Sequence, residues 1–270
     1  MLATAGLIPA LFPSAIAAAS TGPLPALGIQ RLAWAGVRLT CHDTTLFIDA
    51  TSPDPKGGTP GPELQSTTGR TFALATHPHG DHCDPKALAP VLGDDDYLVV
   101  ADDAFRFVDT RRVPIETARL YEPVFLSRGT AAFVAWSVPA ADGLGSPQVS
   151  WVVDGGGKRI IHCGDTMWHG NFWNIARAYG PFDIAFLPIN GFRQSGGIFN
   201  PVANPMSLTP EQAADAAQIL KPKVAIPIHF GATGNPDYVE EARALDRFLS
   251  AAAKRNVTAR VLAPGELFAI

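Results

Sequence analysis

The sequence is poor in charged residues and in cysteine, and both shortages exclude classes of protein. Charged side chains make up 17% of the 270 residues, and the formal net charge is −4. A chain with this balance and no run of Lys or Arg lacks the basic surface of a nucleic-acid binder, so we expect no nucleic-acid partner. Cys41, Cys83 and Cys163 are too few and too widely spaced for a disulfide scaffold or a zinc knuckle, and we expect them to pack as small apolar side chains.

Charge is absent altogether from residues 1–20. This segment ends in the small-residue run Ala15–Ala19, which is typical of a signal-peptidase site, but it has no basic start. We therefore expect an incomplete signal-like segment at 1–20, a domain at 21–270 and export to a bacterial periplasm. A cytoplasmic enzyme with a disordered N-terminus is the alternative. Pro9, Pro13 and the short length of the segment argue against a stable membrane span.

Apolar segments separated by turns and capped helices indicate an α/β chain. Early strands read as hairpins and later strands alternate with helices, an order that suits two packed sheets with helices outside. Thr209, Pro210 and Gln212 predict a capped helix start. The main predicted strands are Ile29–Leu39, Thr45–Asp49, Phe72–Thr76, Tyr97–Ala101, Thr130–Val138, Gln148–Asp154, Lys158–Cys163, Ile184–Pro188, Val224–Ile228 and Thr258–Leu262. The main predicted helices are Pro85–Leu92, Ala104–Arg111, Asn171–Tyr179, Thr209–Leu220 and Asp237–Lys254.

The segment Thr76–His82 carries the strongest chemical signal in the chain. It reads Thr-His-Pro-His-Gly-Asp-His directly after an apolar strand, so three of the seven histidines fall within six residues. His77 and His79 can point toward one ion, while Asp81 and His82 turn toward a neighbouring one. Imidazole and carboxylate together suit zinc, and also manganese or iron. A chance polar loop is the alternative, and the concentration of histidine argues against it.

This motif resembles the signature of the metallo-β-lactamase superfamily. Two further segments follow in the expected order: Ile160–Thr166, which contains Asp165, and Ala225–Gly231, which contains His229. The Trp34-Ala35-Gly36 opening looks most like the branch of the ascorbate-6-phosphate lactonases and the N-acylphosphatidylethanolamine-hydrolysing phospholipases D. The resemblance implies a four-layer αββα sandwich. It also implies two divalent metal ions, with zinc first and manganese or iron as alternatives.

The resemblance also implies how the ligands divide between the two ions. One ion takes His77, His79 and a further group, the second takes Asp81, His82 and His229, and Asp165 bridges the two. The family supplies a histidine as the further group, but motif alignment places Asp142 there. Three alternatives follow: Asp142 binds the first metal, that site is weak or empty, or His169 or another group replaces it. An extra carboxylate favours a harder ion such as manganese.

The implied activity is hydrolysis by a metal-bound hydroxide, with Asp81 as the catalytic residue that orients the water or passes a proton. The substrate class is an ester, lactone or phosphodiester of a small molecule or lipid, and no oligomeric state is indicated. Two alternatives stay open. One is a non-catalytic metal-binding protein, which the Asp142 departure allows. The other is an iron-dependent oxidoreductase, whose diiron form prefers Glu at the position of His79.

Other polar and aromatic side chains lie near the motifs. His162 lies three residues before Asp165 on a strand, so we expect it to face the other side and to be structural. His169 can line a substrate pocket, and Arg193 can contact an anion. Two interpretations are open for Trp168, Phe172 and Trp173: they form an aromatic wall of the substrate pocket, or they pack in the core.

Overall fold

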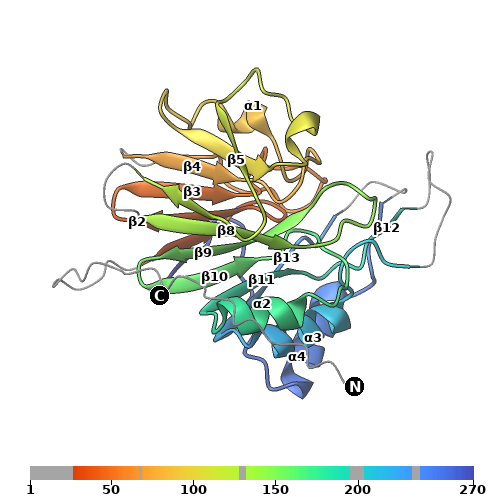
Figure 1. Ribbon diagram of the computed structural model, residues 1–270. Coiled ribbons are helices and arrows are strands. Elements are labelled where there is room, and N and C mark those ends of the chain that lie inside the picture. The colour runs from red at the N-terminus through yellow and green to blue at the C-terminus, as the bar shows by residue number, and fades with distance from the viewer. Residues whose placement is uncertain (1–26, 67–68, 128–131, 195–203, 233–237) are drawn as a thin grey trace, which may run out of the picture.

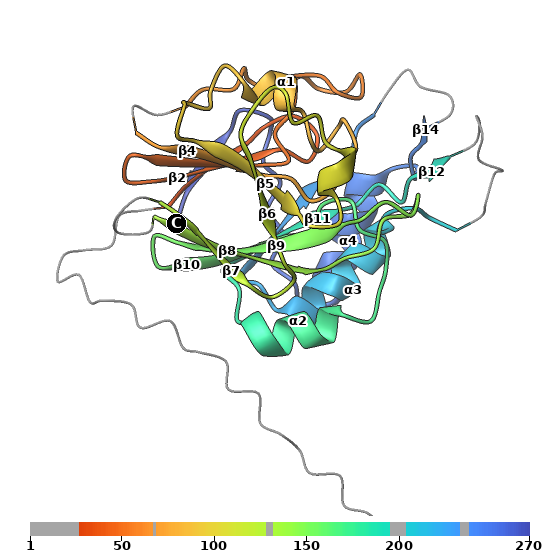
Figure 2. The same ribbon diagram turned by 45° about the horizontal axis from the view of Figure 1, so that its top comes forward.

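Two large β-sheets face each other in the computed structural model, which describes residues 27–66, 69–127, 132–194, 204–232 and 238–270 (Figures 1 and 2). The predicted signal-like segment at 1–20 lies outside the described residues. Among those residues, no helix is both long and apolar enough to cross a membrane.

The strands of both sheets are mixed in direction, with a parallel half next to an antiparallel half. The first sheet has the order β15 (Leu267–Ala269), β1 (Gly28–Arg31), β2 (Val37–Cys41), β3 (Thr44–Ile48), β4 (Thr71–Leu74), β5 (Tyr97–Ala101) and β6 (Ile115–Ala118). The second has the order β13 (Val224–Ile228), β11 (Ile184–Pro188), β10 (Lys158–His162), β9 (Val149–Gly155), β8 (Phe133–Pro139) and β7 (Pro123–Leu126). β12 (Arg193–Gln194) and β14 (Tyr238–Val239) form a small separate pair.

Helices cover the outer faces of the two sheets. Figure 1 shows α2 (Phe172–Tyr179), α3 (Pro210–Leu220) and α4 (Ala244–Lys254) together on the second sheet, while the single turn α1 (Pro85–Leu88) lies over the first. Apolar side chains fill the space between the sheets and the space beneath each outer layer. The predicted αββα sandwich is confirmed.

The apolar layers explain why the central strands are almost purely hydrophobic. Every residue of β4 and β11 is buried, because each strand has parallel neighbours on both sides and is covered on both faces. Cys41, Cys83 and Cys163 are free and buried, one in each apolar layer, as the sequence predicted.

Two predicted segments are interrupted by tight turns. The strand predicted at Ile29–Leu39 splits into β1 and β2, because Trp34 has a φ of 56° and the Leu32 amide donates to the Gly36 carbonyl at 2.8 Å. The helix predicted from Pro85 ends after one turn, close to Pro90, which has no amide hydrogen to continue it.

Two other predicted elements are shorter in the structure than the sequence indicated, because tertiary packing determines whether a segment forms regular structure. Only Phe105–Phe107 of the predicted helix Ala104–Arg111 is helical, and both phenylalanines are exposed, so that segment has no apolar face to bury. In place of a strand at Thr258–Leu262, only an isolated bridge joins Ala259 to Ala225. The predicted start of β8 at residues 130–131 lies outside the described residues.

Helix α3 begins as predicted from its sequence. The Thr209 hydroxyl accepts a hydrogen bond from the Gln212 amide at 3.2 Å, and the Gln212 side chain accepts one from the Thr209 amide at 3.0 Å. This capping box satisfies two amides that would otherwise lack partners where the helix starts against the second sheet.

Removing the cap of α3 should destabilise the protein measurably. Thr209→Ala leaves the Gln212 amide without its acceptor, and we expect the free energy of unfolding to fall by about 1 kcal/mol. Urea denaturation followed by circular dichroism measures this. Ser250→Ala, at an exposed position of α4, is the matched control and should leave the midpoint almost unchanged. Equal midpoints for Thr209→Ala and wild type would contradict this assignment.

Candidate metal centre

The polar cluster of this protein lies where strands of both sheets end. The Thr76–His82 segment follows β4, Asp142 follows β8, Asp165 follows β10 and His229 follows β13. In open sheets of this kind, the carboxyl ends of the strands are where ligand sites collect. The sandwich therefore brings residues far apart in sequence to one edge of the molecule.

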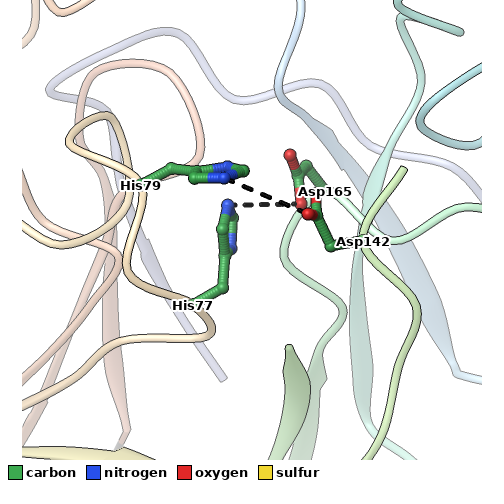
Figure 3. A group of neighbouring side chains, drawn as sticks. All are labelled: His77, His79, Asp142 and Asp165. Atoms are coloured by element: carbon green, nitrogen blue, oxygen red, sulfur yellow. Dashed lines mark ion pairs between the residues drawn. The ribbon is translucent and has the colours of Figure 1, made fainter. Parts of the chain in front are cut away.

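The first group contains two histidines from one sheet and two carboxylates from the other. Ligand atoms of His77, His79, Asp142 and Asp165 all lie within 4.8 Å of one another. In Figure 3 the two imidazoles approach from one side and the carboxylates from the opposite side, so all four point toward a shared space. His77 Nε2 is 3.6 Å from Asp165 Oδ1, and His79 Nε2 is 4.0 Å from Asp142 Oδ2.

The second group contains Asp81, His82 and His229, whose ligand atoms also lie within 4.8 Å of one another. Asp165 connects the two groups. Its Oδ1 faces His77, while its Oδ2 is 3.8 Å from both His82 Nε2 and His229 Nε2. A carboxylate in this position can contribute one oxygen to each of the two ligand groups. The structure thus brings together all seven residues that the sequence predicted as metal ligands.

The unpaired side-chain atoms of the cluster have the chemistry of a metal-binding site. Five buried ligand atoms have no hydrogen-bond partner in the described part of the chain: His77 Nε2, His82 Nε2, Asp165 Oδ1 and both ring nitrogens of His229. Buried polar atoms are nearly always paired, because an unpaired one costs desolvation free energy. Unpaired imidazole nitrogens that face carboxylates are the donor set of a divalent metal ion.

Asp49 orients the histidines from behind and was not singled out from the sequence. It lies at the end of β3, is 1% exposed, and its Oδ2 is 2.8 Å from His82 Nδ1. Its two oxygens also accept hydrogen bonds from the Thr76 amide and hydroxyl, both at 2.8 Å. The Thr76 hydroxyl is 3.0 Å from His77 Nδ1. This network leaves the Nε2 atoms of His77 and His82 free to bind a ligand.

Two further residues, neither of them predicted to belong to the site, contact Asp81. The indole Nε1 of Trp34 donates to Asp81 Oδ2 at 3.1 Å, and Lys56 Nζ lies 3.2 Å from the same oxygen. The Trp34 ring also packs against His229, with ring centroids 4.2 Å apart. Lys56 comes from the long loop after β3, where no pattern marked it, and only the folded chain places it here.

Burial and neighbouring charges shift the protonation of the metal-free cluster. Burial disfavours charge on His82, but the carboxylates of Asp165, Asp49 and Asp81 outweigh it and raise its pKa to about 9. Burial raises the pKa of Asp165 to about 7, against the opposing effect of His82. Burial and the charge of His82 lower the pKa values of His77 and His229 well below the ordinary value.

Gly164 lets the backbone before Asp165 pass close to the Asp49 network. Its φ is +62°, and a Cβ atom there would lie 2.7 Å from the Thr76 hydroxyl. Any side chain would displace the hydroxyl that holds His77 and would also strain the backbone.

The remaining candidates lie outside both ligand groups. The ring of His162 is buried, and its Nε2 lies 2.8 Å from the Ala35 carbonyl oxygen. His169 stacks on Phe172 with centroids 4.1 Å apart, and its Nδ1 accepts a hydrogen bond from the Asn171 amide. Arg193 is paired with Glu241. Trp168 packs against Phe172 and Trp173.

Comparison with known families decides the classification. A family model described as a β-lactamase superfamily domain matches residues 22–230. The chain belongs to this family. The prediction made from the His-rich motif is therefore confirmed.

Named relatives of this β-lactamase superfamily chain are metal-dependent hydrolases. A UPF0173 metal-dependent hydrolase of Thermococcus kodakarensis is 30% identical over 162 residues, which cover 58% of this chain and 65% of the relative. That match spans slightly under two thirds of the relative's length. A UPF0173 metal-dependent hydrolase of Thermus thermophilus is 28% identical over 251 residues, covering 88% of this chain and 97% of the relative.

Solved structures share the fold at low sequence identity. Igni18, a metallo hydrolase of Ignicoccus hospitalis, matches with a TM-score of 0.69 and 16% identity, over 91% of this chain and 98% of its own. The diiron β-hydroxylase CmlA of Streptomyces venezuelae matches with a TM-score of 0.65 and 15% identity, over 93% of this chain and 54% of its own. At these identities the likeness shows the β-lactamase superfamily fold alone.

Metal affinity should rise with pH in this superfamily chain. A metal ion must displace the protons from Asp165 and His82, whose pKa values are about 7 and about 9 in the metal-free state. We expect the apparent affinity to increase steeply up to about pH 7, less steeply up to about pH 9, and little beyond. Competition with a chelator at several pH values measures this. An affinity independent of pH over this range would contradict the protonation scheme.

Asp49→Asn should weaken metal binding without removing any ligand of the two groups. The amide nitrogen cannot accept the His82 Nδ1 proton, so the ring loses the hydrogen bond that fixes Nδ1 as the donor and directs Nε2 toward the ligand group. We expect a loss of about 10–100-fold in metal affinity, measured by the same chelator competition. Asp103→Asn, at an exposed position, is the matched control. If both variants bound metal as wild type does, the orienting role of Asp49 would be wrong.

Proposed function

We propose that this chain is a metal-dependent hydrolase that binds two divalent metal ions and cleaves an ester, a lactone or a phosphodiester of a small molecule or lipid. The observation that carries the proposal is the pair of ligand groups joined by Asp165, with buried ring nitrogens that lack any partner among the described residues. The matching family and the names of the relatives support hydrolysis as the reaction class.

We assign one ion to His77, His79, Asp142 and Asp165, and the other to Asp81, His82, His229 and Asp165. When bound, two such ions lower the pKa of water and polarise a carbonyl or phosphoryl oxygen. Zinc suits the four imidazoles, and the three carboxylates also admit manganese or iron. Of the three alternatives for the first site, a ligand role for Asp142 has the best support, because its Oδ2 faces His79 Nε2.

The side chains around Asp81 are arranged to hold its carboxylate in one orientation. Trp34 and Lys56 both contact Oδ2, and the Nε2 atoms of His82 and His229 lie 3.7 and 4.0 Å from the same oxygen. We therefore propose Asp81 as the catalytic residue that orients the attacking water or carries a proton to the leaving group. The Lys56 side chain is 25% exposed, so the Lys56–Asp81 pair lies at the solvent side of the cluster.

Other aspects of the function rest on composition. The low content of Lys and Arg disfavours a polynucleotide substrate. Residues 1–20, outside the described part of the chain, support our proposal of export to a bacterial periplasm. No observation on the described residues favours an iron-dependent oxidation over hydrolysis, because the likeness to a diiron hydroxylase extends to the fold only.

Activity should depend on Asp81 on a panel of generic substrates. Zinc- or manganese-loaded protein is assayed with p-nitrophenyl acetate, a simple lactone and bis(p-nitrophenyl) phosphate. We expect turnover on at least one, and a loss of about 100-fold or more in Asp81→Ala, because general acid–base groups contribute factors of this size.

Asp103→Ala, which removes a carboxylate at an exposed position, is the control and should turn over substrate as wild type does. Circular dichroism establishes that both variants are folded. Tight metal binding without turnover on any substrate would favour the non-catalytic alternative. Unchanged turnover in Asp81→Ala would contradict the role given to that residue.

A further inference from the structure

A cavity lies directly beside the metal centre. Its volume is about 350 Å³, and its lining includes the end of β1, the loop after β3, the two residues after His229 and the segment before β15. Trp34 and Lys56, the two residues that contact Asp81, also line it. The cavity and the metal centre therefore share a wall, but none of the seven candidate metal ligands lines the cavity.

The most unusual residue of this cavity is Arg31. It is only 4% exposed, and among the described residues no carboxylate forms an ion pair with its guanidinium. Its Nη1 donates to the Leu262 carbonyl at 2.7 Å, whereas its buried Nε has no partner in the ranges that the structure describes. Burying a cation without a counter-ion costs desolvation free energy, and a bound anion would offset that cost.

The surroundings hold Arg31 in place without neutralising it. Its guanidinium lies over the Phe230 ring, 4.6 Å from the centroid, and its backbone bonds to Gly265 and Glu266 across from β1. Burial lowers its pKa only to about 10, so it stays charged at neutral pH.

The acidic side chains of the cavity form no ion pair with Arg31 among the described residues. Glu266 accepts hydrogen bonds from the Ala263 amide at 3.0 Å and from Arg260 Nη2 at 3.2 Å. Asp54 is exposed, and no ion pair joins it to Arg31 among the described residues. The cavity thus keeps a fixed positive charge that its own carboxylates do not satisfy.

We propose that this cavity binds a small organic anion, a carboxylate or a phosphate monoester, with Arg31 as its charged partner. A planar guanidinium fixed on an aromatic ring is suited to hydrogen-bond such an anion, and the cavity volume suits a small molecule. This binding site does not depend on the proposed hydrolysis, since Arg31 belongs to neither ligand group.

Isothermal titration calorimetry with benzoate and with phenyl phosphate tests the proposal at low ionic strength. The full chain is titrated loaded with metal and again after chelation, because an anion bound at the metal centre is lost on chelation. We expect at least one of the two anions to bind in both states, and its affinity to fall about tenfold or more in Arg31→Met. Arg31→Lys should retain part of the affinity, since it keeps the charge.

Arg243→Met is the charge-matched control, since Arg243 is exposed and far from the cavity in the chain, and it should bind as wild type does. If Arg31→Met does not fold, Val261→Glu replaces it. Val261 lines the cavity and is 37% exposed, so a carboxylate there should compete with the ligand and weaken binding. Leu120→Glu, also exposed, is its control.

Three results would overturn the proposal. In the first, the wild-type protein binds neither anion. In the second, the anion no longer binds after chelation but still binds to Arg31→Met. In the third, Arg31→Met and Val261→Glu both bind the anion with the affinity of wild type. None of them bears on turnover at the metal centre, so failure of the anion site and failure of the proposed hydrolysis can be told apart.

Discussion

Buried imidazole nitrogens that face the Asp165 carboxylate, with no hydrogen-bond partner among the described residues, are the constraint on which this structure depends. His77, His82 and His229 each carry an unpaired Nε2 in the interior, and Asp165 lies among them. The protein atoms alone leave this arrangement incomplete, and an incomplete buried polar network costs free energy. A pair of cations supplies what the chain lacks, which is why the site is best understood as a metal centre.

Three non-glycine residues with left-handed backbone geometry lie at this same place, and five others lie elsewhere in the described part of the chain. Trp34, Asp49 and His229 have φ values of 56°, 49° and 56°, in the left-handed region that residues other than glycine rarely adopt. Each lies just before or just after a strand, where the chain must turn sharply to present its side chain. Such strain persists only where surrounding structure enforces it, and it gathers at functional sites. The sandwich thus stabilises a geometry that local preferences oppose.

Sequence and structure agree best where chemistry is concentrated in a short segment. The Thr76–His82 motif indicated both the fold and the two-group ligand arrangement, and the capping box of α3 was visible in Thr209 and Gln212. Asp142 was placed by motif alignment, and the structure brings it to His79. These signals lie within a few neighbouring residues, or they follow one another along the chain in the order of the metallo-β-lactamase motifs.

What the sequence did not reveal depends on contacts between distant segments. Asp49 orients His82 across 33 positions, and Lys56 reaches Asp81 from a loop rich in Gly and Pro. The helix expected at Asp237–Lys254 starts only at Ala244, because Tyr238 stacks on Phe192 and pairs with β12. Asp237 itself lies outside the described residues. In each case a tertiary contact overrides the local pattern.

Metal analysis combined with X-ray absorption spectroscopy of the purified protein tests the central claim most directly. Our account predicts about two zinc, manganese or iron ions per chain, bound only by nitrogen and oxygen, since all three cysteines are buried elsewhere. Metal far below one ion per chain, or a sulfur ligand in the first coordination sphere, would contradict it.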